Sequence, residues 1–192
     1  MQELKDRIVK EGKVLPGNII KVDGFLNHRI DTELMDHIAE EFGKHFNMDE
    51  VTMILTAEAS GIALSAIVAH HFHKPMIFAK KAKSDNIEGG LYQSDIFSYT
   101  YKKKVTLLVS KEWLSADDKV LIIDDFMANG EAMQGLCDIV NAAGATLVGI
   151  GCAVEKGFQG GGDRLRAAGV NLKSLAIIES AEPGNIVFRG ED

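Results

Sequence analysis

Short runs of largely apolar residues restrict the fold of this chain more than any other feature. Such runs cover residues 51–55, 120–123 and 147–154, and a shorter run covers 76–78 after Pro75. Apolar side chains on successive residues, rather than on alternate ones, are typical of parallel strands that are covered on both faces. The runs therefore predict the buried sheet of an α/β protein.

Helical patterns separate these runs. Apolar residues recur every four positions over 34–42, after Asp31, whose side chain suits an N-cap. Two further helices are predicted over 62–73 and 133–140, and Gly144 is placed to end the second one. Strands and helices that alternate in this way predict a mostly parallel sheet flanked by helices.

Length and composition indicate how many domains the chain forms and which classes of partner they exclude. With 192 residues and no repeat or linker, residues 1–192 are expected to form a single domain. The formal net charge of −7 argues against a general surface for nucleic acid or anionic membrane. A polyanionic ligand would then need a local site of cations or backbone amides.

The expected location is the cytoplasm. Cys137 and Cys152 lie in apolar runs without a metal-binding spacing, and we interpret them as buried thiols in a reducing compartment. The first residues alternate in charge, unlike a signal peptide, and no run reaches the roughly 18 apolar residues of a membrane span.

Residues 80–104 interrupt the pattern of strands and helices. This stretch is polar, has lysines at both ends and contains Gly89-Gly90. Its length exceeds that of a routine connection, so two interpretations stay open: a hairpin with a mobile tip, or a lid over a ligand site.

A pair of acids follows the central apolar run. Asp124 and Asp125 stand at the expected carboxyl end of a parallel strand, where α/β proteins bind ligands. The small residues of 128–132 lead into a helix N-terminus and can present backbone amides to a phosphate. The pattern suits a ribose 5-phosphate, with hydroxyls toward the acids. A turn with a helix cap is the alternative.

At this point the sequence resembles the type I phosphoribosyltransferases. VLIIDDFMANGEA at 120–132 is similar to their fingerprint for 5-phosphoribosyl 1-diphosphate (PRPP). The similarity extends to bacterial xanthine phosphoribosyltransferases through further stretches: IKVDGFLNHRI at 20–30, MILTAEASGIAL at 53–64, FAKKAKS at 78–84 and GIGCAVEKGFQ at 149–159. The resemblance implies the family's fold, with a small hood formed by the N-terminal segment and the region after about residue 155.

The resemblance also implies a PRPP site. Asp124 and Asp125 would hold the ribose hydroxyls near a magnesium ion that binds with PRPP. The remaining contacts would come from two loops and a cationic stretch: Ala128, Asn129, Gly130, Glu131 and Ala132 for the 5-phosphate, Ala59, Ser60 and Gly61 for the diphosphate, and Lys80, Lys81 and Lys83 as a clamp. Two residues depart from the family, in which Arg usually replaces Lys80 and a neutral Gln replaces Glu131. The alternatives are that the lysines form a solvated surface charge run and that residues 57–61 form a plain strand–helix turn.

The purine site implied by the resemblance uses Ile20, Asn27 and Lys156. A cation at Lys156 suits a base with two carbonyl oxygens, such as xanthine, and Asn27 offers both a donor and an acceptor. Ile20 replaces the family's usual Leu. Phe126 is placed to stack on the base or to pack in the core. A surface Lys, a turn Asn and a core Ile are the alternative interpretations.

The resulting hypothesis is a xanthine phosphoribosyltransferase of purine salvage, expected to form a homodimer. No residue is assigned as catalytic acid or base. Two rival functions stay open: a guanine or adenine phosphoribosyltransferase, and a PRPP-sensing regulator without activity. His70 and His73, one helical turn apart, suggest either a metal site or a favourable charge at a helix C-terminus.

Overall fold

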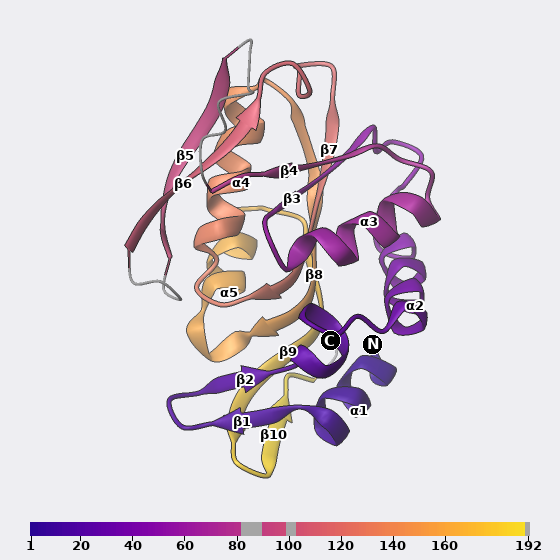
Figure 1. Ribbon diagram of the computed structural model, residues 1–192, viewed down its shortest axis with the longest axis vertical. Coiled ribbons are helices and arrows are strands. Elements are labelled where there is room, and N and C mark those ends of the chain that lie inside the picture. Colours follow the sequence, from indigo (N-terminus) through magenta and orange to yellow (C-terminus); the bar gives the residue numbers. More distant parts are fainter. Residues whose placement is uncertain (82–89, 99–102, 191–192) are drawn as a thin grey trace.

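The computed structural model describes residues 1–81, 90–98 and 103–190. Its central sheet has the strand order β10-β9-β8-β7-β3-β4 (Figure 1). All neighbours pair in parallel except β10, which runs antiparallel to β9. This sheet confirms the predicted class. Its strands are β3 (Met53–Ala57), β4 (Met76–Ala79), β7 (Lys119–Met127), β8 (Thr146–Lys156), β9 (Leu172–Glu182) and β10 (Asn185–Phe188).

Helices cover both faces of the sheet, which explains the continuous apolar runs. Along β7, Leu121 and Ile123 pack into one core cluster, whereas Val120 and Ile122 pack into the other. Successive side chains of a strand point to opposite faces, so a strand that is buried on both sides needs apolar residues throughout. Figure 1 shows the helices that form the two layers: α2 (Thr32–Gly43) and α3 (Gly61–His71) on one face, and α4 (Glu131–Ala142) and α5 (Gly161–Ala167) on the other.

The predicted helix boundaries agree with the structure. Asp31 caps α2, and its carboxylate accepts a hydrogen bond from the Leu34 amide at 3.2 Å. Gly144 follows α4 with φ of 70°, a conformation that glycine adopts without strain. Ser60 stands at the N-cap position of α3 but makes no capping hydrogen bond with its side chain.

Residues 91–98 and 103–110 form a separate antiparallel pair of strands, β5 (Leu91–Ser98) and β6 (Lys103–Ser110). Ile96 and Leu107 are buried in the same core cluster as α4, so the hairpin packs on the outer side of that helix. The predicted hairpin pairing is therefore confirmed, whereas the predicted mobile tip lies outside the described residues. Lys83, Gly89 and Lys102 lie outside the described residues, and a lid over the site stays a prediction.

The N-terminal segment and the last strand gather at one end of the molecule (Figure 1). The sequence pattern predicted no helix or strand in these regions. The N-terminal ones are α1 (Gln2–Glu11), β1 (Lys13–Leu15), β2 (Ile19–Lys21) and η1, a π-helical turn at Asp23–Asn27. The charged α1 offers only Leu4 and Ile8 as fully buried anchors. Two buried side chains are too few for a clear helical pattern, so tertiary packing decides this region.

The contact between the hairpin and α4 yields a stability prediction. A Cβ added at Gly135 would lie 2.5 Å from Ile96 Cγ2 and 3.1 Å from Leu107 Cδ1. We expect Gly135→Ala to lower the free energy of unfolding by about 1–3 kcal/mol through overpacking. The higher helix propensity of Ala offsets up to about 1 kcal/mol of this loss. Thermal unfolding measures this change, and Gly24→Ala, where no atom lies within 4 Å, is the control. Equal stability of Gly135→Ala and the parent protein would contradict this packing.

Candidate functional site

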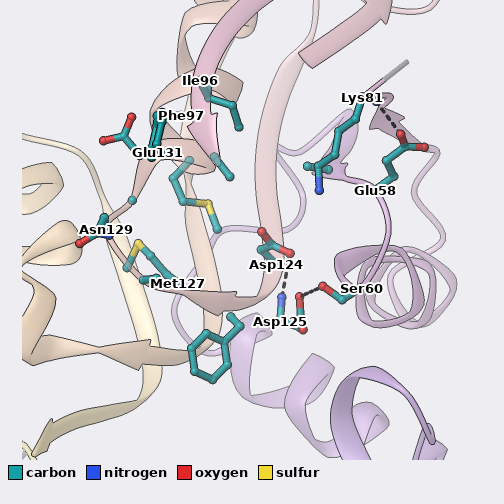
Figure 2. A pocket seen from close by; sticks show the side chains of 16 residues that line it. Glu58, Ser60, Lys81, Ile96, Phe97, Asp124, Asp125, Met127, Asn129 and Glu131 are labelled. Atoms are coloured by element: carbon teal, nitrogen blue, oxygen red, sulfur yellow. Dashed lines mark hydrogen bonds between the residues drawn. The ribbon is translucent and has the colours of Figure 1, made fainter. Parts of the chain in front are cut away.

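A pocket of about 200 Å³ opens at the carboxyl end of β7 (Figure 2). Segments far apart in the sequence meet there: the β3–α3 turn, Lys81 after β4, the hairpin, and the chain from Asp124 to α4. The lining residues are Ala57, Glu58, Ser60, Lys81, Ile96, Phe97 and all residues from 124 to 133.

The Asp125 side chain is held at the pocket by hydrogen bonds from two parts of the chain. It is 1% exposed, and each of its carboxylate oxygens accepts a hydrogen bond from a different part of the chain. The Ser60 hydroxyl donates to Oδ1 at 2.8 Å, and the Asn27 side-chain amide donates to Oδ2 at 2.9 Å. Figure 2 shows the bond from Ser60 at the start of α3. Asp125 thus links β7 to α3 and to η1.

Asp124 has a different environment. Its Oδ1 accepts the Asp125 amide at 3.0 Å, and the residue is 7% exposed. Burial raises the pKa of the Asp124 carboxyl well above its ordinary value, the neighbouring charge of Asp125 raises it further, and Lys81 opposes the shift. The buried pair therefore favours a ligand that brings positive charge or hydroxyl donors.

The turn between β3 and α3 fits closely around the acid pair because Gly61 lacks a side chain. A Cβ at Gly61 would lie 2.2 Å from Asp124 Oδ1 and 2.3 Å from Thr56 Oγ1. Beside this turn, Glu58 Oε1 accepts the Lys81 amide at 2.5 Å. The Lys81 side chain extends from there toward the space above Asp124 (Figure 2). The turn, the acids and one lysine thus form one wall of the pocket.

The loop from Ala128 to Ala132 forms the opposite wall. Gly130 has φ of 78°, and the twelve-residue helix α4 begins at the next residue, Glu131. The first amides of a helix lack partners within the helix, and the helix dipole makes this end positive. Figure 2 shows the Glu131 carboxylate directed away from Asp124. This wall therefore offers backbone N–H donors, and the Glu131 carboxylate is directed away from the acid pair.

The predicted purine-site residues Ile20, Asn27 and Lys156 are absent from the described lining of the pocket. The Lys156 ammonium donates to the Asn18 carbonyl at 3.0 Å and lies 5.5 Å from the centre of the Phe126 ring. Burial lowers the pKa of Lys156 below its ordinary value. Ile20 on β2 is 7% exposed and packs in the core. Asn27 adjoins the pocket through Asp125.

The structure thus brings most of the predicted PRPP contacts to one place. Ser60, Lys81, both acids and residues 128–132 line the pocket, whereas Ala59, Gly61 and Lys80 are absent from its described lining. The Lys80 backbone instead pairs with Leu108 of β6.

Sequence reasoning missed several lining residues, of which Glu58 and the aromatic Phe97 stand out. An acid beside the β3–α3 turn was a usable signal for Glu58. No local pattern marked Phe97, because the hairpin brings it to the pocket.

Within the described part of the chain, no three His, Cys, Asp or Glu side chains gather as a metal site. His71 is instead paired with Asp36 at 2.8 Å, and the rings of His70 and His73 lie 6.3 Å apart. None of the described helices combines the length and apolarity needed to span a bilayer.

Comparison with known proteins decides the family. A model of the phosphoribosyl transferase domain matches residues 25–168. The chain belongs to the phosphoribosyltransferase family. The xanthine phosphoribosyltransferase of Lachnoclostridium phytofermentans is 53% identical to it, with 100% of both chains covered. The enzyme of the same name from Bifidobacterium animalis subsp. lactis is also 53% identical, covering 98% of this chain and 100% of its own.

Solved phosphoribosyltransferase structures share the fold. The adenine phosphoribosyltransferase of Giardia lamblia, solved with 9-deazaadenine, aligns with a TM-score of 0.74 at 21% identity, over 90% of this chain and 96% of that one. The adenine phosphoribosyltransferase of Rhodothermus marinus aligns with a TM-score of 0.73 at 20% identity, over 91% and 98%. These neighbours support the α/β architecture of this phosphoribosyltransferase.

The raised pKa of Asp124 predicts that ionisation of this carboxyl lowers the stability of the ligand-free phosphoribosyltransferase in a pH-dependent way. A carboxyl whose pKa is higher in the folded than in the unfolded state destabilises the fold when ionised. This destabilisation is complete above the folded pKa, shrinks as pH falls below it, and is gone below the unfolded pKa. We therefore expect Asp124→Asn to raise the Tm at pH 7.5 by a few degrees, since about 2–4 °C corresponds to 1 kcal/mol at this size. The gain should shrink as pH falls below the raised pKa of Asp124 toward the ordinary pKa of an Asp carboxyl.

Thermal unfolding over a pH series measures this effect. Asp117→Asn is the matched control because Asp117 is exposed. A Tm gain for Asp124→Asn that is constant at all pH values would refute the assigned ionisation.

Proposed function

We propose that the chain is a xanthine phosphoribosyltransferase, which converts xanthine and PRPP to xanthosine 5′-phosphate and diphosphate. The observation that carries the proposal is the 53% identity over the full chain to a protein of that name. In this reaction a bond forms between a xanthine nitrogen and C1 of the ribose. The bond from C1 to the diphosphate oxygen breaks, and its electron pair leaves with diphosphate while the nitrogen loses its proton.

The acid pair is proposed to hold the ribose. Hydroxyl donors placed at Asp124 and Asp125 would relieve the desolvation of two adjacent carboxylates. Asp125 is fixed from both sides by Ser60 and Asn27, so it presents its charge in one orientation. Fixed groups of this kind place C1 for attack without a further loss of conformational entropy.

The loop at 128–132 is proposed to bind the 5-phosphate through backbone amides at the start of α4. The turn at Ala59, Ser60 and Gly61 is proposed to bind the diphosphate, with Lys81 as the cation in the described lining of the pocket. Lys80 is a weaker candidate, because it lies outside the described lining. Lys83 is proposed by the resemblance and lies outside the described residues.

The donor set fits a magnesium ion that PRPP brings with it. The two carboxylates fall short of a complete protein cage, and Mg²⁺ commonly binds through one or two carboxylates together with waters and phosphate oxygens. Asp124 and Asp125 would lie near this ion. When bound, the ion would neutralise charge on the departing diphosphate.

Xanthine is proposed to lie between the PRPP site and the N-terminal elements. Lys156 would face a carbonyl oxygen of the base, and Phe126, which already lies under the Lys156 ammonium, would contact the ring. Asn27 keeps its side-chain oxygen for a base N–H while its amide nitrogen holds Asp125. Ile20 would shape the site from within the core.

The domain organisation, oligomeric state and cellular location of the chain are also predicted. We propose that 1–192 is a single domain whose hood comprises the elements from α1 to η1 and the region after about residue 155. A homodimer and a cytoplasmic location stay predictions.

Product analysis tests the proposed function. The protein is incubated with magnesium, PRPP and each of xanthine, guanine and adenine, and the nucleotide is identified. We expect xanthosine 5′-phosphate as the main product, and expect Asp125→Asn to reduce kcat/KM at least about tenfold, since hydrogen bonds to charged groups contribute about 1.5–3 kcal/mol. Preferred turnover of guanine or adenine would favour another purine enzyme, and binding of PRPP without turnover would favour a regulator.

Glu131 yields a prediction about PRPP affinity. Its carboxylate lies in the first turn of α4, where it interacts favourably with the ligand-free helix dipole and competes with an incoming phosphate. We expect Glu131→Gln to tighten PRPP binding by less than about tenfold at low salt, and expect the gain to fade as salt screens the repulsion. Turnover should change little.

Calorimetric titration of PRPP at two salt concentrations measures this gain. Glu112→Gln removes the same charge at an exposed position after β6 and is the control. Weaker binding by Glu131→Gln at low salt would mean that the carboxylate assists the ligand.

A further inference from the structure

The short helix α5 packs directly behind the 128–132 loop. A Cβ added at Gly161, the first residue of α5, would lie 2.5 Å from the Asn129 carbonyl carbon, 2.6 Å from the Ala128 oxygen and 2.6 Å from the Gly130 nitrogen. Backbone therefore meets backbone here, which only glycine permits at these distances. The backbone of α5 at Gly161 therefore packs against the loop at Asn129 and Gly130.

Arg164 of α5 reaches the same loop. Its Nη2 donates to the Asn129 carbonyl at 2.6 Å. Because a trans peptide is planar, the carbonyl of Asn129 and the N–H of Gly130 point in opposite directions. Holding the carbonyl on the α5 side therefore turns the Gly130 N–H away from α5. A rotated peptide would present an oxygen where the loop now presents a donor.

A buried ionic cluster fixes α5 in this place. A helix of seven residues is unstable alone. Glu155 at the end of β8 is 0% exposed and accepts Arg166 Nη1 at 3.1 Å, Arg166 Nη2 at 2.6 Å and the hydroxyl of Ser174. A Cβ at Gly162 would lie 2.1 Å from Glu155 Oε1, so α5 lies directly on this carboxylate. The cluster joins α5 to β8 and β9.

We propose that Arg164 is a positioning residue for the phosphate loop, and that the Glu155–Arg166 pair holds α5 where Arg164 can act. The inference rests on the proposed function, in which this loop binds the 5-phosphate of PRPP. Arg164 acts through the Asn129–Gly130 peptide. Its removal should therefore weaken PRPP binding and leave the xanthine site unaffected.

Substitutions of Arg164 separate positioning from simple charge. Arg164→Met removes the donor and the charge, whereas Arg164→Lys keeps the charge and an ammonium group with rotatable N–H donors. Lys119→Met is the matched control, because Lys119 is exposed at the start of β7, the end opposite the acids. The Kd for PRPP is measured by calorimetry, KM for xanthine and kcat by product formation, and exchange of the Asn129 and Gly130 amides by ligand-free hydrogen exchange.

We expect Arg164→Met to raise the Kd for PRPP about three- to tenfold, the equivalent of one lost hydrogen bond. Its kcat and its KM for xanthine should stay within about twofold, and the loop amides should exchange faster. Arg164→Lys should recover most of the affinity. An unchanged Kd, or an equal rise in Kd for Lys119→Met, would overturn the inference.

The two proposals fail in different ways. If the parent protein binds no PRPP, the proposed function fails, and the claim about phosphate binding fails with it. Ligand-free exchange still tests the positioning, because unchanged exchange in Arg164→Met would overturn it. Normal PRPP binding and turnover by the parent protein, together with an unaffected Arg164→Met, would overturn only the further inference.

Discussion

The buried carboxylate of Asp125 is the interaction on which the arrangement of the site depends. Its two oxygens accept hydrogen bonds from Ser60 and Asn27, which lie 65 and 98 residues away in sequence. A desolvated charge is unfavourable unless its acceptor positions are filled, so the fold must bring these donors to it. The start of α3 and the η1 turn are therefore tied to the end of β7. This connection joins the proposed ribose, diphosphate and purine positions.

Two glycines allow the backbone to approach the site closely. Gly61 leaves space for the Asp124 carboxylate, and Gly161 allows α5 to touch the 128–132 loop. In both places a methyl group would collide with fixed polar atoms or with backbone. Main-chain surface therefore lies close to the acid pair at Gly61 and close to the 128–132 loop at Gly161, which suits the phosphate groups of the proposed ligand. Backbone amides bind phosphate without adding cations to a chain whose net charge is −7.

The electrostatic balance of the pocket follows from the same geometry. Burial and the adjacent Asp125 raise the pKa of Asp124, and the charge of Lys81 on the same wall opposes that shift. The ligand-free site thus retains unfavourable free energy that hydroxyls and a cation can relieve. Behind the opposite wall, Glu155 is fully buried but is paired with Arg166, so its charge supports the structure. Asp124 and Glu155 differ because Glu155 has a cationic partner within hydrogen-bonding distance, whereas Asp124 has none among the described residues.

The sequence by itself determined the features that depend on short-range patterns. Continuous apolar runs identified β3, β4, β7 and β8, because strands buried on both faces need apolar side chains at successive residues. The acid pair and the small loop after it marked the carboxyl end of β7, and Asp31 and Gly144 marked helix ends. Resemblance to the family then placed the candidate residues in order along the chain.

Only the tertiary structure decided which distant residues meet. The pairing of Asn27 with Asp125, the arrival of Phe97 from the hairpin, and the support of the loop by Arg164 all join residues that no local pattern connects. The same holds for α1, whose few buried side chains gain their significance from the surfaces they cover. The physical reason is that periodicity reports which face of an element is buried. The partner of that face is set by how the whole chain packs.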